Sequence, residues 1–312
     1  MSNLEFPGQL TRAFRFIEFY IQIMKTLIVP LDFSEESLSG LKMAKLLASK
    51  TGAEIKMVYV AVTNTKKDAE VFGNEKKIAE KNMEDILQKH KMTGDKELKI
   101  EYIIREGQVF KEITTLAENY EDPVTVLSTH GSTGFEEVFI GGNAYKIVSH
   151  SRNPVITVRR SRLSSNIDRI VLPLDITFQT REKVPYTVDL AKIFGSEIHL
   201  LTIRLSNLKS IEKKLHQYAA QVIQYFDNQR VAYTVRHLQG SNLTDLTLDY
   251  ARSINADLIS VMTEQEKSVS NLLLGKFAHQ MINKAYIPVM LFPNYHLRII
   301  TEEIWTRWTI NA

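Results

Sequence analysis

The stretch Leu27-Ile28-Val29-Pro30-Leu31-Asp32 is an apolar run that ends in an aspartate, and the chain contains it twice. The second copy reads Ile170-Val171-Leu172-Pro173-Leu174-Asp175. Short apolar runs of this kind, bounded by turn signals, are typical of strands buried on both faces of a parallel sheet. Further pairs keep the same offset, namely Ala48/Ala191, Gly52/Gly195 and Glu54/Glu197. The sequence therefore predicts two copies of one folding unit.

Predicted strands and helices alternate in both copies. Strands are expected at Thr26–Leu31, Glu54–Val60, Lys99–Arg105, Val124–Ser128 and Val155–Val158, and again at Ile170–Leu174, Ile198–Ile203, Ala232–Leu238, Leu258–Met262 and Val289–Phe292. Helical patterns lie between them, and Ser34 is a suitable N-cap for the first. Alternation of this kind implies parallel strands with right-handed crossovers and helices on both faces. We expect an α/β fold of two domains, each with a five-stranded parallel sheet.

The domain limits follow from the repeat. We expect an N-terminal extension at 1–23, a first domain at 24–159, a linker at 160–165, a second domain at 166–293 and a tail at 294–312. Met24 would make a natural start, which leaves 1–23 outside the fold; a membrane or partner segment is the alternative. The extension has no small-residue cleavage site and is a poor signal peptide. Both tryptophans, Trp305 and Trp308, lie in the tail, which we expect to cover an apolar surface.

Composition excludes several classes of protein. The formal net charge is only +3 over 312 residues, which does not favour nucleic acid as a partner. The sequence has no cysteine, so disulfides, thiol catalysis and cysteine-ligated zinc are excluded. The chain contains no apolar run of the roughly 18 residues that a membrane helix needs. We expect a cytoplasmic protein without a membrane partner.

A glycine loop follows the fourth predicted strand of the first copy. It reads Ser128-Thr129-His130-Gly131, then nine residues, then Gly141-Gly142-Asn143. The second copy has Met262-Thr263-Glu264-Gln265 and Gly275-Lys276-Phe277 at the same spacing. Glycines let backbone N–H groups approach phosphate oxygens, and the start of the following helix attracts anions. Parallel sheets bind ligands at the carboxyl ends of their strands, so Asp32, Val60 and the loop should converge on one crevice.

These features resemble a tandem universal stress protein of the UspA type over roughly 24–159 and 166–293. The resemblance rests on the strand-end aspartate in Val29–Ser34, on the glycine loop and on the closing segment Val148–Val158. Members that bind ATP carry a loop of the form Gly-x2-Gly-x9-Gly-Ser/Thr. Here Ser128, Gly131, Gly141 and Gly142 stand at the four positions. The resemblance implies two Rossmann-like domains of the adenine nucleotide alpha hydrolase-like kind.

The resemblance also implies a ligand, ATP with Mg²⁺, and a set of contacts. Asp32 would contact the ribose or the adenine, and backbone atoms near Val60 would hold the adenine edge. Phosphates would lie against Gly131, Gly141, Gly142 and Asn143. The remaining candidates for the site are Pro30, Ser34, Ser128 and His130. Family members pair through their last strands, so Val155–Val158 and Val289–Phe292 should meet within the chain as a pseudo-dimer; a further homodimer stays open.

Each candidate also has a structural interpretation. Asp32 can cap its own turn, the loop glycines can be turn residues, and His130, a conceivable base or metal ligand, fits an exposed loop residue better. Asp175 has no intact glycine loop in its half of the chain, so it is better interpreted as an evolutionary relic or as a cap. Ser128 and Gly142 depart from the family pattern, and each change costs about 1 kcal/mol of binding, the net scale of one hydrogen bond.

Three classes of function stay open. The leading hypothesis is a stress-response switch that binds ATP in its first half and alters the binding of an unknown protein partner. The alternative is a scaffold that binds no nucleotide. An ATP-hydrolysing enzyme has the least support, because the sequence shows no nucleophile–base constellation and no P-loop. We therefore expect no catalysis beyond slow, incidental ATP hydrolysis.

Overall fold

The computed structural model describes residues 24–62, 69–93, 96–129, 141–159, 163–263 and 274–293. The predicted extension, the first linker residues 160–162 and the tail lie outside these ranges. The first half contains β1 (Thr26–Pro30), α2 (Ser37–Thr51), β2 (Glu54–Ala61), α3 (Ala69–His90), β3 (Met92–Thr93), β4 (Lys96–Glu97), β5 (Ile100–Glu106), α4 (Val109–Ala117), β6 (Pro123–Ser128), α5 (Gly142–His150) and β7 (Val155–Val158). The second half contains β8 (Arg169–Leu174), η2 (Phe178–Arg181), α6 (Val184–Phe194), β9 (Glu197–Arg204), α7 (Lys209–Gln229), β10 (Tyr233–Gln239), α8 (Leu243–Ser253), β11 (Leu258–Met262), α9 (Lys276–Lys284) and β12 (Val289–Phe292).

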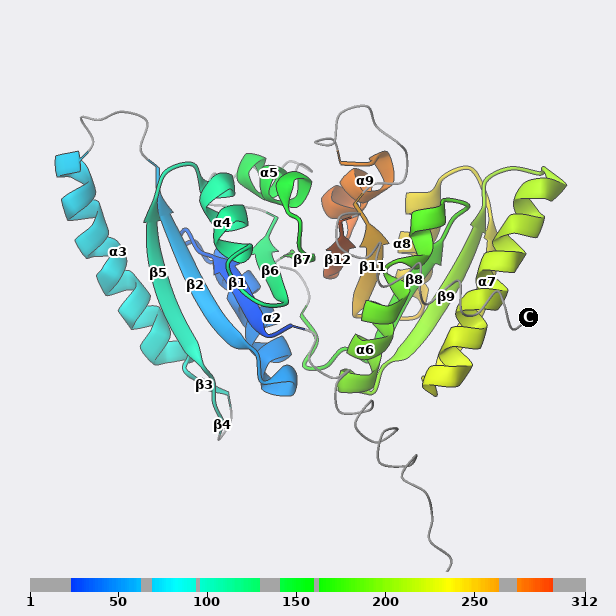
Figure 1. The fold of residues 1–312 in the computed structure, drawn as a ribbon, viewed down its shortest axis with the longest axis horizontal. Helices are drawn as coiled ribbons and strands as arrows, with labels where there is room; N and C mark the ends of the chain where they lie inside the picture. The colour runs from blue at the N-terminus through cyan, green and yellow to red at the C-terminus, as the bar shows by residue number, and fades with distance from the viewer. Residues whose placement is uncertain are drawn as a thin grey trace, which may run out of the picture.

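Ten of these strands form one continuous sheet. Their order is β10-β9-β8-β11-β12-β7-β6-β1-β2-β5, so each half contributes five parallel strands. The halves meet where β12 pairs with β7 in antiparallel register, and Figure 1 shows them as two wings on either side of this junction. The predicted α/β class and the predicted meeting of the last strands are both confirmed.

An approximate two-fold axis relates the halves. Ile156 of β7 pairs with Met290 of β12, and these residues occupy equivalent positions of the repeat. The rings of Tyr145 and His279, which are also equivalent, lie edge to face with centroids 5.6 Å apart. The axis therefore passes between β7 and β12 and between α5 and α9, which lie together in Figure 1.

Helices cover both faces of the sheet. Apolar side chains of α2, α3, α6 and α7 pack on one face, and those of α4, α5, α8 and α9 pack on the other. The first of these cores is continuous across the junction, because it includes Ile156, Val158, Met290 and Phe292. Close approach of α2 depends on Gly40, where a Cβ would lie 3.2 Å from the carbonyl oxygen of Val126.

The structure adds two elements that the sequence pattern did not predict. The hairpin of β3 and β4 lies between α3 and β5. In the second half, α7 passes to β10 through a shorter connection without such a hairpin. In the second half, the 3₁₀ helix η2 stands where α2 begins in the first. The other strands and helices lie within a few residues of their predicted ranges.

One buried polar position of the repeat is occupied by different residues in the two halves. Lys56 of β2 is buried and forms ion pairs with Glu101 (2.7 Å) and Glu54 (3.0 Å). The equivalent residue, His199 of β9, is also buried. Its Nδ1 lies 2.9 Å from the hydroxyl of Tyr250, and its Nε2 lies 3.6 Å from Glu197. Burial lowers the pKa of His199; Glu197 opposes this shift, and the charges of Arg169 and Arg236 reinforce it.

A charge placed in the junction should destabilise the whole fold. Met290 has 0% exposure, so Met290→Asp buries an unpaired carboxylate and is expected to cost about 3–5 kcal/mol of unfolding free energy. Urea unfolding followed by circular dichroism measures this loss. The control is Ile78→Asp, because Ile78 of α3 is 63% exposed and its change should stay within about 0.5 kcal/mol. Equal effects would contradict a buried junction.

His199 should make the fold acid-sensitive. Its pKa in the folded state lies below the unperturbed value of about 6.5. Folding therefore opposes protonation, and the stability present above about pH 6.5 is lost as the pH falls toward the folded-state pKa. The urea midpoint should drop further between about pH 7 and about pH 5 in the wild type than in His199→Gln. Parallel curves for the two proteins would refute this role.

Candidate functional site

A cavity of about 270 Å³ opens at the carboxyl ends of β1, β2 and β6, against the starts of α4 and α5. Seven predicted residues line it, namely Pro30, Asp32, Val60, Ser128, Gly141, Gly142 and Asn143. Ser34 does not line the cavity but contacts Asp32. His130 and Gly131 lie outside the described residues. The structure thus brings most of the candidates together, while their binding roles stay predictions.

Asp32 is held in a local turn directly after β1. Its Oδ1 accepts hydrogen bonds from the backbone N–H of Ser34 (3.1 Å) and from the Ser34 hydroxyl (2.5 Å). Ser34 in turn accepts the N–H of Ser37 at 3.1 Å. The predicted N-cap position is corrected, because α2 begins at Ser37 with Glu36 at the N-cap. The side chain of Ser34 instead stabilises the turn before the helix, and this turn presents the exposed Asp32 at the cavity wall.

An aromatic pair supports the same turn. Phe33 has φ 65°, a left-handed conformation that is strained for a bulky residue. Its ring stacks on Tyr59 at 4.7 Å, and the Tyr59 hydroxyl donates to Glu75 of α3 at 2.6 Å. Burial, together with Glu75, raises the pKa of Tyr59 to about 12. Sequence reasoning missed Tyr59, which lines the cavity; the only available signal was its position beside Val60 at the end of a strand.

The start of α5 forms the opposite wall. Gly141 occupies the N-cap position, and its N–H donates to the Thr129 carbonyl at 2.8 Å. Within the described residues, no side chain caps this end and the first turn contains no acid. The first N–H groups of a helix have no partner inside it, and they carry partial positive charge. Those of Gly142, Asn143 and Ala144 are therefore suited to an anion.

The described structure does not require glycine at either lining position. Gly141 has φ −57°, and a Cβ there would make only an ordinary contact of 3.5 Å with the Thr129 oxygen. A Cβ on Gly142 would meet no described atom within 4 Å. Among the described residues, neither backbone conformation nor packing explains the absence of side chains. This observation favours close approach of a ligand over a purely structural turn.

The second half keeps the turn but fills the corresponding region. Asp175 accepts from the N–H (2.8 Å) and hydroxyl (2.6 Å) of Thr177, as Asp32 does from Ser34. Lys183 stands at the position of Gly40 and is buried, with Nζ bonded to the Thr180 carbonyl at 2.7 Å. Burial lowers its pKa to about 8. Met262, at the position of Ser128, is also buried; Gln265 lies outside the described residues.

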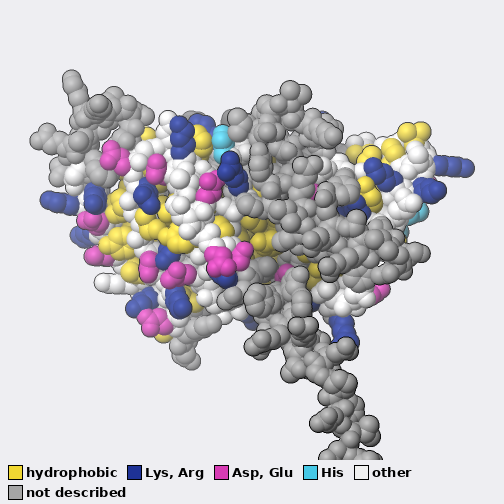
Figure 2. Space-filling model, viewed as in Figure 1, with side chains coloured by type: hydrophobic (Ala, Val, Ile, Leu, Met, Phe, Trp, Pro, Cys, Tyr) yellow, Lys and Arg dark blue, Asp and Glu magenta, His cyan; other side chains and the backbone are white. Residues whose placement is uncertain are grey.

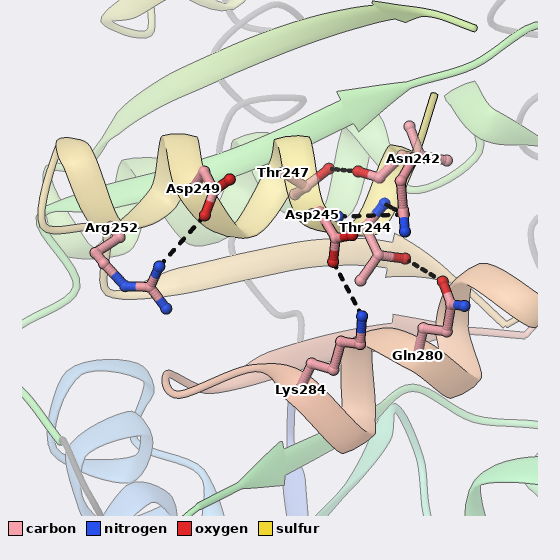
Figure 3. A network of polar contacts seen from close by, with 9 residues as sticks. Asn242, Thr244, Asp245, Thr247, Asp249, Arg252, Gln280 and Lys284 are labelled. Carbon is pink, nitrogen blue, oxygen red and sulfur yellow. Dashed lines mark hydrogen bonds and ion pairs between the residues drawn. The ribbon is translucent and has the colours of Figure 1, made fainter. Parts of the chain in front are cut away.

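The helix pairs that follow these sites are joined by different chemistry. Phe110 of α4 lies 4.8 Å from the His150 ring and 5.6 Å from the ammonium of Lys146, both on α5. Figure 3 shows polar links between α8 and α9, where Thr244 donates to Gln280 and Lys284 pairs with Asp245. Asn242 also caps the start of α8. In the pair beside the cavity, Phe110 contacts α5 in addition to the buried aliphatic side chains of both helices.

The described surface offers little evidence for candidate sites other than this cavity. No group of three or more His, Cys, Asp or Glu side chains in the described ranges could hold a metal ion. Among the same residues, no helix is both long and apolar enough to cross a membrane. Lys, Arg, Asp and Glu side chains are interspersed over the first half in the view of Figure 2. The cavity beside Asp32 is thus the candidate site with converging features.

Two five-stranded parallel units joined through their last strands define a tandem Rossmann-like protein. A family model described as the universal stress protein family matches residues 24–159 and 166–293. The chain therefore belongs to the universal stress protein family, as the sequence resemblance predicted.

Relatives of known sequence match about half of the chain. Universal stress protein MJ0531 of Methanocaldococcus jannaschii is 26% identical over 144 residues, which are 45% of this chain and 85% of the relative. Universal stress protein MJ0577 of the same organism is 26% identical over 157 residues, or 44% and 95%. The crystal structure of a universal stress protein from Archaeoglobus fulgidus covers 86% of this chain and 98% of its own, with a TM-score of 0.71 and 20% identity. That last likeness concerns the fold of both halves.

Proposed function

We propose that the first-half cavity binds an adenine nucleotide, ATP, and that the bound state alters the binding of a protein partner. One observation carries this proposal: a strand-end aspartate, the end of strand β2 at Val60 and a helix start with two glycines converge on one cavity. Its volume of about 270 Å³ is close to the lower limit of typical ligand pockets, about 300 Å³.

Each wall suits a different part of a nucleotide. The carboxylate of Asp32 can accept hydrogen bonds from a ribose hydroxyl or an adenine amino group. Backbone groups at the end of β2, near Val60, can hold the edge of a base. The N–H groups at Gly142 and Asn143 attract phosphates, and the absence of a side chain at Gly142 lets an oxygen approach the backbone.

Mg²⁺ fits this proposal only as a companion of the phosphates. The described residues contain no cluster of acidic or histidine side chains that could hold the ion alone. Mg²⁺ commonly keeps several waters and binds one or two carboxylates together with substrate phosphates. Among the described lining residues Asp32 is the one such carboxylate, and the ion would neutralise phosphate charge.

The second half serves, in this proposal, as an intrachain partner that completes the sheet. We propose no catalytic role, because neither the sequence nor the described cavity presents a nucleophile beside a base. The cysteine-free sequence agrees with a working place in the cytoplasm, where thiols stay reduced.

A nucleotide-free scaffold is the second candidate, and one observation favours it. Asp32 and Asp175 form the same turn with the same kind of partner, although the second half lacks the glycine at the position of Gly142. The aspartate thus has a structural task in both halves. Only a binding experiment that treats the two halves separately can distinguish this scaffold from a nucleotide switch.

Nucleotide should stabilise the wild type through Gly142. Mg-ATP at about 100 times its dissociation constant adds roughly 2.7 kcal/mol to the binding domain, seen as a rise in Tm. Gly142→Val places a branched side chain at the helix start, so it should abolish this rise. The control is Gly73→Val on α3, where a Cβ also meets no described atom within 4 Å; it should keep the rise. A rise of equal size in all three proteins would place the nucleotide elsewhere, and no rise in any would support the scaffold.

The two aspartates should differ in binding and in folding. An asparagine keeps the acceptor oxygen of either turn, so Asp32→Asn should retain the wild-type Tm without ligand, whereas Asp175→Asn should lower it, because the Asp175 charge stabilises the buried ammonium of Lys183. Loss of one charged hydrogen bond costs about 1.5–3 kcal/mol, so Asp32→Asn should weaken ATP binding at least about tenfold in titration calorimetry. Asp175→Asn should leave the Kd unchanged. Release of several phosphates per chain, lost in Asp32→Asn, would instead identify a hydrolase.

A further inference from the structure

The approximate two-fold axis creates two equivalent places at the junction of the halves. Because β7 and β12 are antiparallel, the end of each strand lies beside the beginning of the other. The chain leaves β7 after Val158 and leaves β12 after Phe292. In each case it leaves next to the start of the strands of the opposite half. What covers the end of β7 can therefore be compared with what covers the end of β12.

The linker covers the place at the end of β7. Arg159 donates from Nη1 to the Asn283 carbonyl at 3.1 Å, and Leu163 packs against the core shared by both halves. Ser164 donates to Asp257 at 2.5 Å, directly before β11. The same carboxylate accepts the N–H groups of Asp168 and Arg169. The linker is therefore anchored to the amino ends of the strands of the second half.

The equivalent place at the end of β12 is a cavity of about 450 Å³. Its apolar wall includes Phe292 and Tyr186, whose rings lie 5.5 Å apart, and the prolines 123 and 154. Pro123 occupies the repeat position of Asp257. Glu118 and Asp122 are exposed at the lining. Pro293 also lines the cavity, so the following residues begin at its edge.

We propose that residues 294–300 of the tail lie across this cavity, as the linker lies across the place at the end of β7. The segment reads Asn-Tyr-His-Leu-Arg-Ile-Ile, and seven residues reach at most about 25 Å, enough to cross a cavity that starts at the preceding residue. Leu297 is the fifth residue after β12, as Leu163 is the fifth after β7.

Composition and charge suit this occupant. The segment offers four apolar or aromatic side chains, at Tyr295, Leu297, Ile299 and Ile300, to a wall of Tyr186, Phe292 and prolines. Its charged side chain is Arg298, opposite in sign to Asp122 of the cavity; the other lining acid, Glu118, already pairs with Arg152 at 3.6 Å. The linker likewise carries arginines and is anchored on the acid Asp257. The tail would bury the apolar residues at this end of the β7–β12 junction, and Arg298 would lie at the acidic edge of the cavity.

Crosslinking tests this placement in the full chain. The sequence has no cysteine, so Arg152→Cys with Leu297→Cys introduces one defined pair, with Arg152 at the cavity lining. The control pair is Lys213→Cys with Leu297→Cys, because Lys213 is exposed on α7. A docked tail raises the effective concentration of the cavity pair, so its intrachain disulfide should form at least about tenfold faster in dilute protein, measured by intact mass. Equal rates would overturn the proposal, and so would a disulfide that joins two chains.

Hydrogen exchange provides a second reading without cysteines. Leu297→Asp should release the tail and raise amide exchange at Asn153 at least about tenfold, because Asn153 lines the cavity. The control is Thr301→Asp, one residue beyond the proposed contact, which should leave that exchange unchanged. Exchange that responds to neither substitution, or equally to both, would overturn the proposal.

Discussion

The antiparallel pairing of β7 with β12 is the constraint on which the rest of the architecture depends. Without it, each half would end in a short strand of four buried, mostly apolar residues, Val155–Val158 or Val289–Phe292, with an open row of backbone donors and acceptors. Such edges promote association with other chains. The pairing closes both edges at once, makes one core continuous across the halves and fixes the approximate two-fold axis. It therefore explains why a duplicated unit persists as one body.

The same constraint lets the two halves diverge away from the junction. The sheet needs both units, but a ligand needs only one cavity. The second half keeps the turn at Asp175 and the helix start at Gly275, yet it places the buried Lys183 and Met262 where the first half has Gly40 and Ser128. Backbone strain also differs between the halves. Phe33 has a positive φ. Ile176, the equivalent residue of the second half, is not among the described residues with a positive φ. Within the described residues, the first half combines a strained turn with an open cavity.

The fold could be predicted from the sequence because the signals for its strands and helices are local. Apolar runs that end in Asp32 and Asp175 mark buried strands, and their alternation with helical patterns defines a parallel sheet whose carboxyl ends meet. The hairpin of β3 and β4 was missed because its strands of two residues, such as Lys96–Glu97, give no periodic pattern. Tyr59 was missed because its place in the cavity depends on Phe33 across the turn and Glu75 on another helix. Whether glycine is required at Gly142 also depends on neighbours in space.

The walls of the cavity are organised without a ligand. Ser34 holds Asp32, Glu75 and Phe33 hold Tyr59, and the N–H of Gly141 is bonded to Thr129. A ligand would thus meet prearranged groups and lose little free energy in ordering them. One route from the cavity to the second half is the short helix α5. This helix presents Gly142 to the cavity and, one turn later, Tyr145 to His279 of α9. A shift at the start of α5 would reach the two-fold axis, and with it the second half, within a single helical turn.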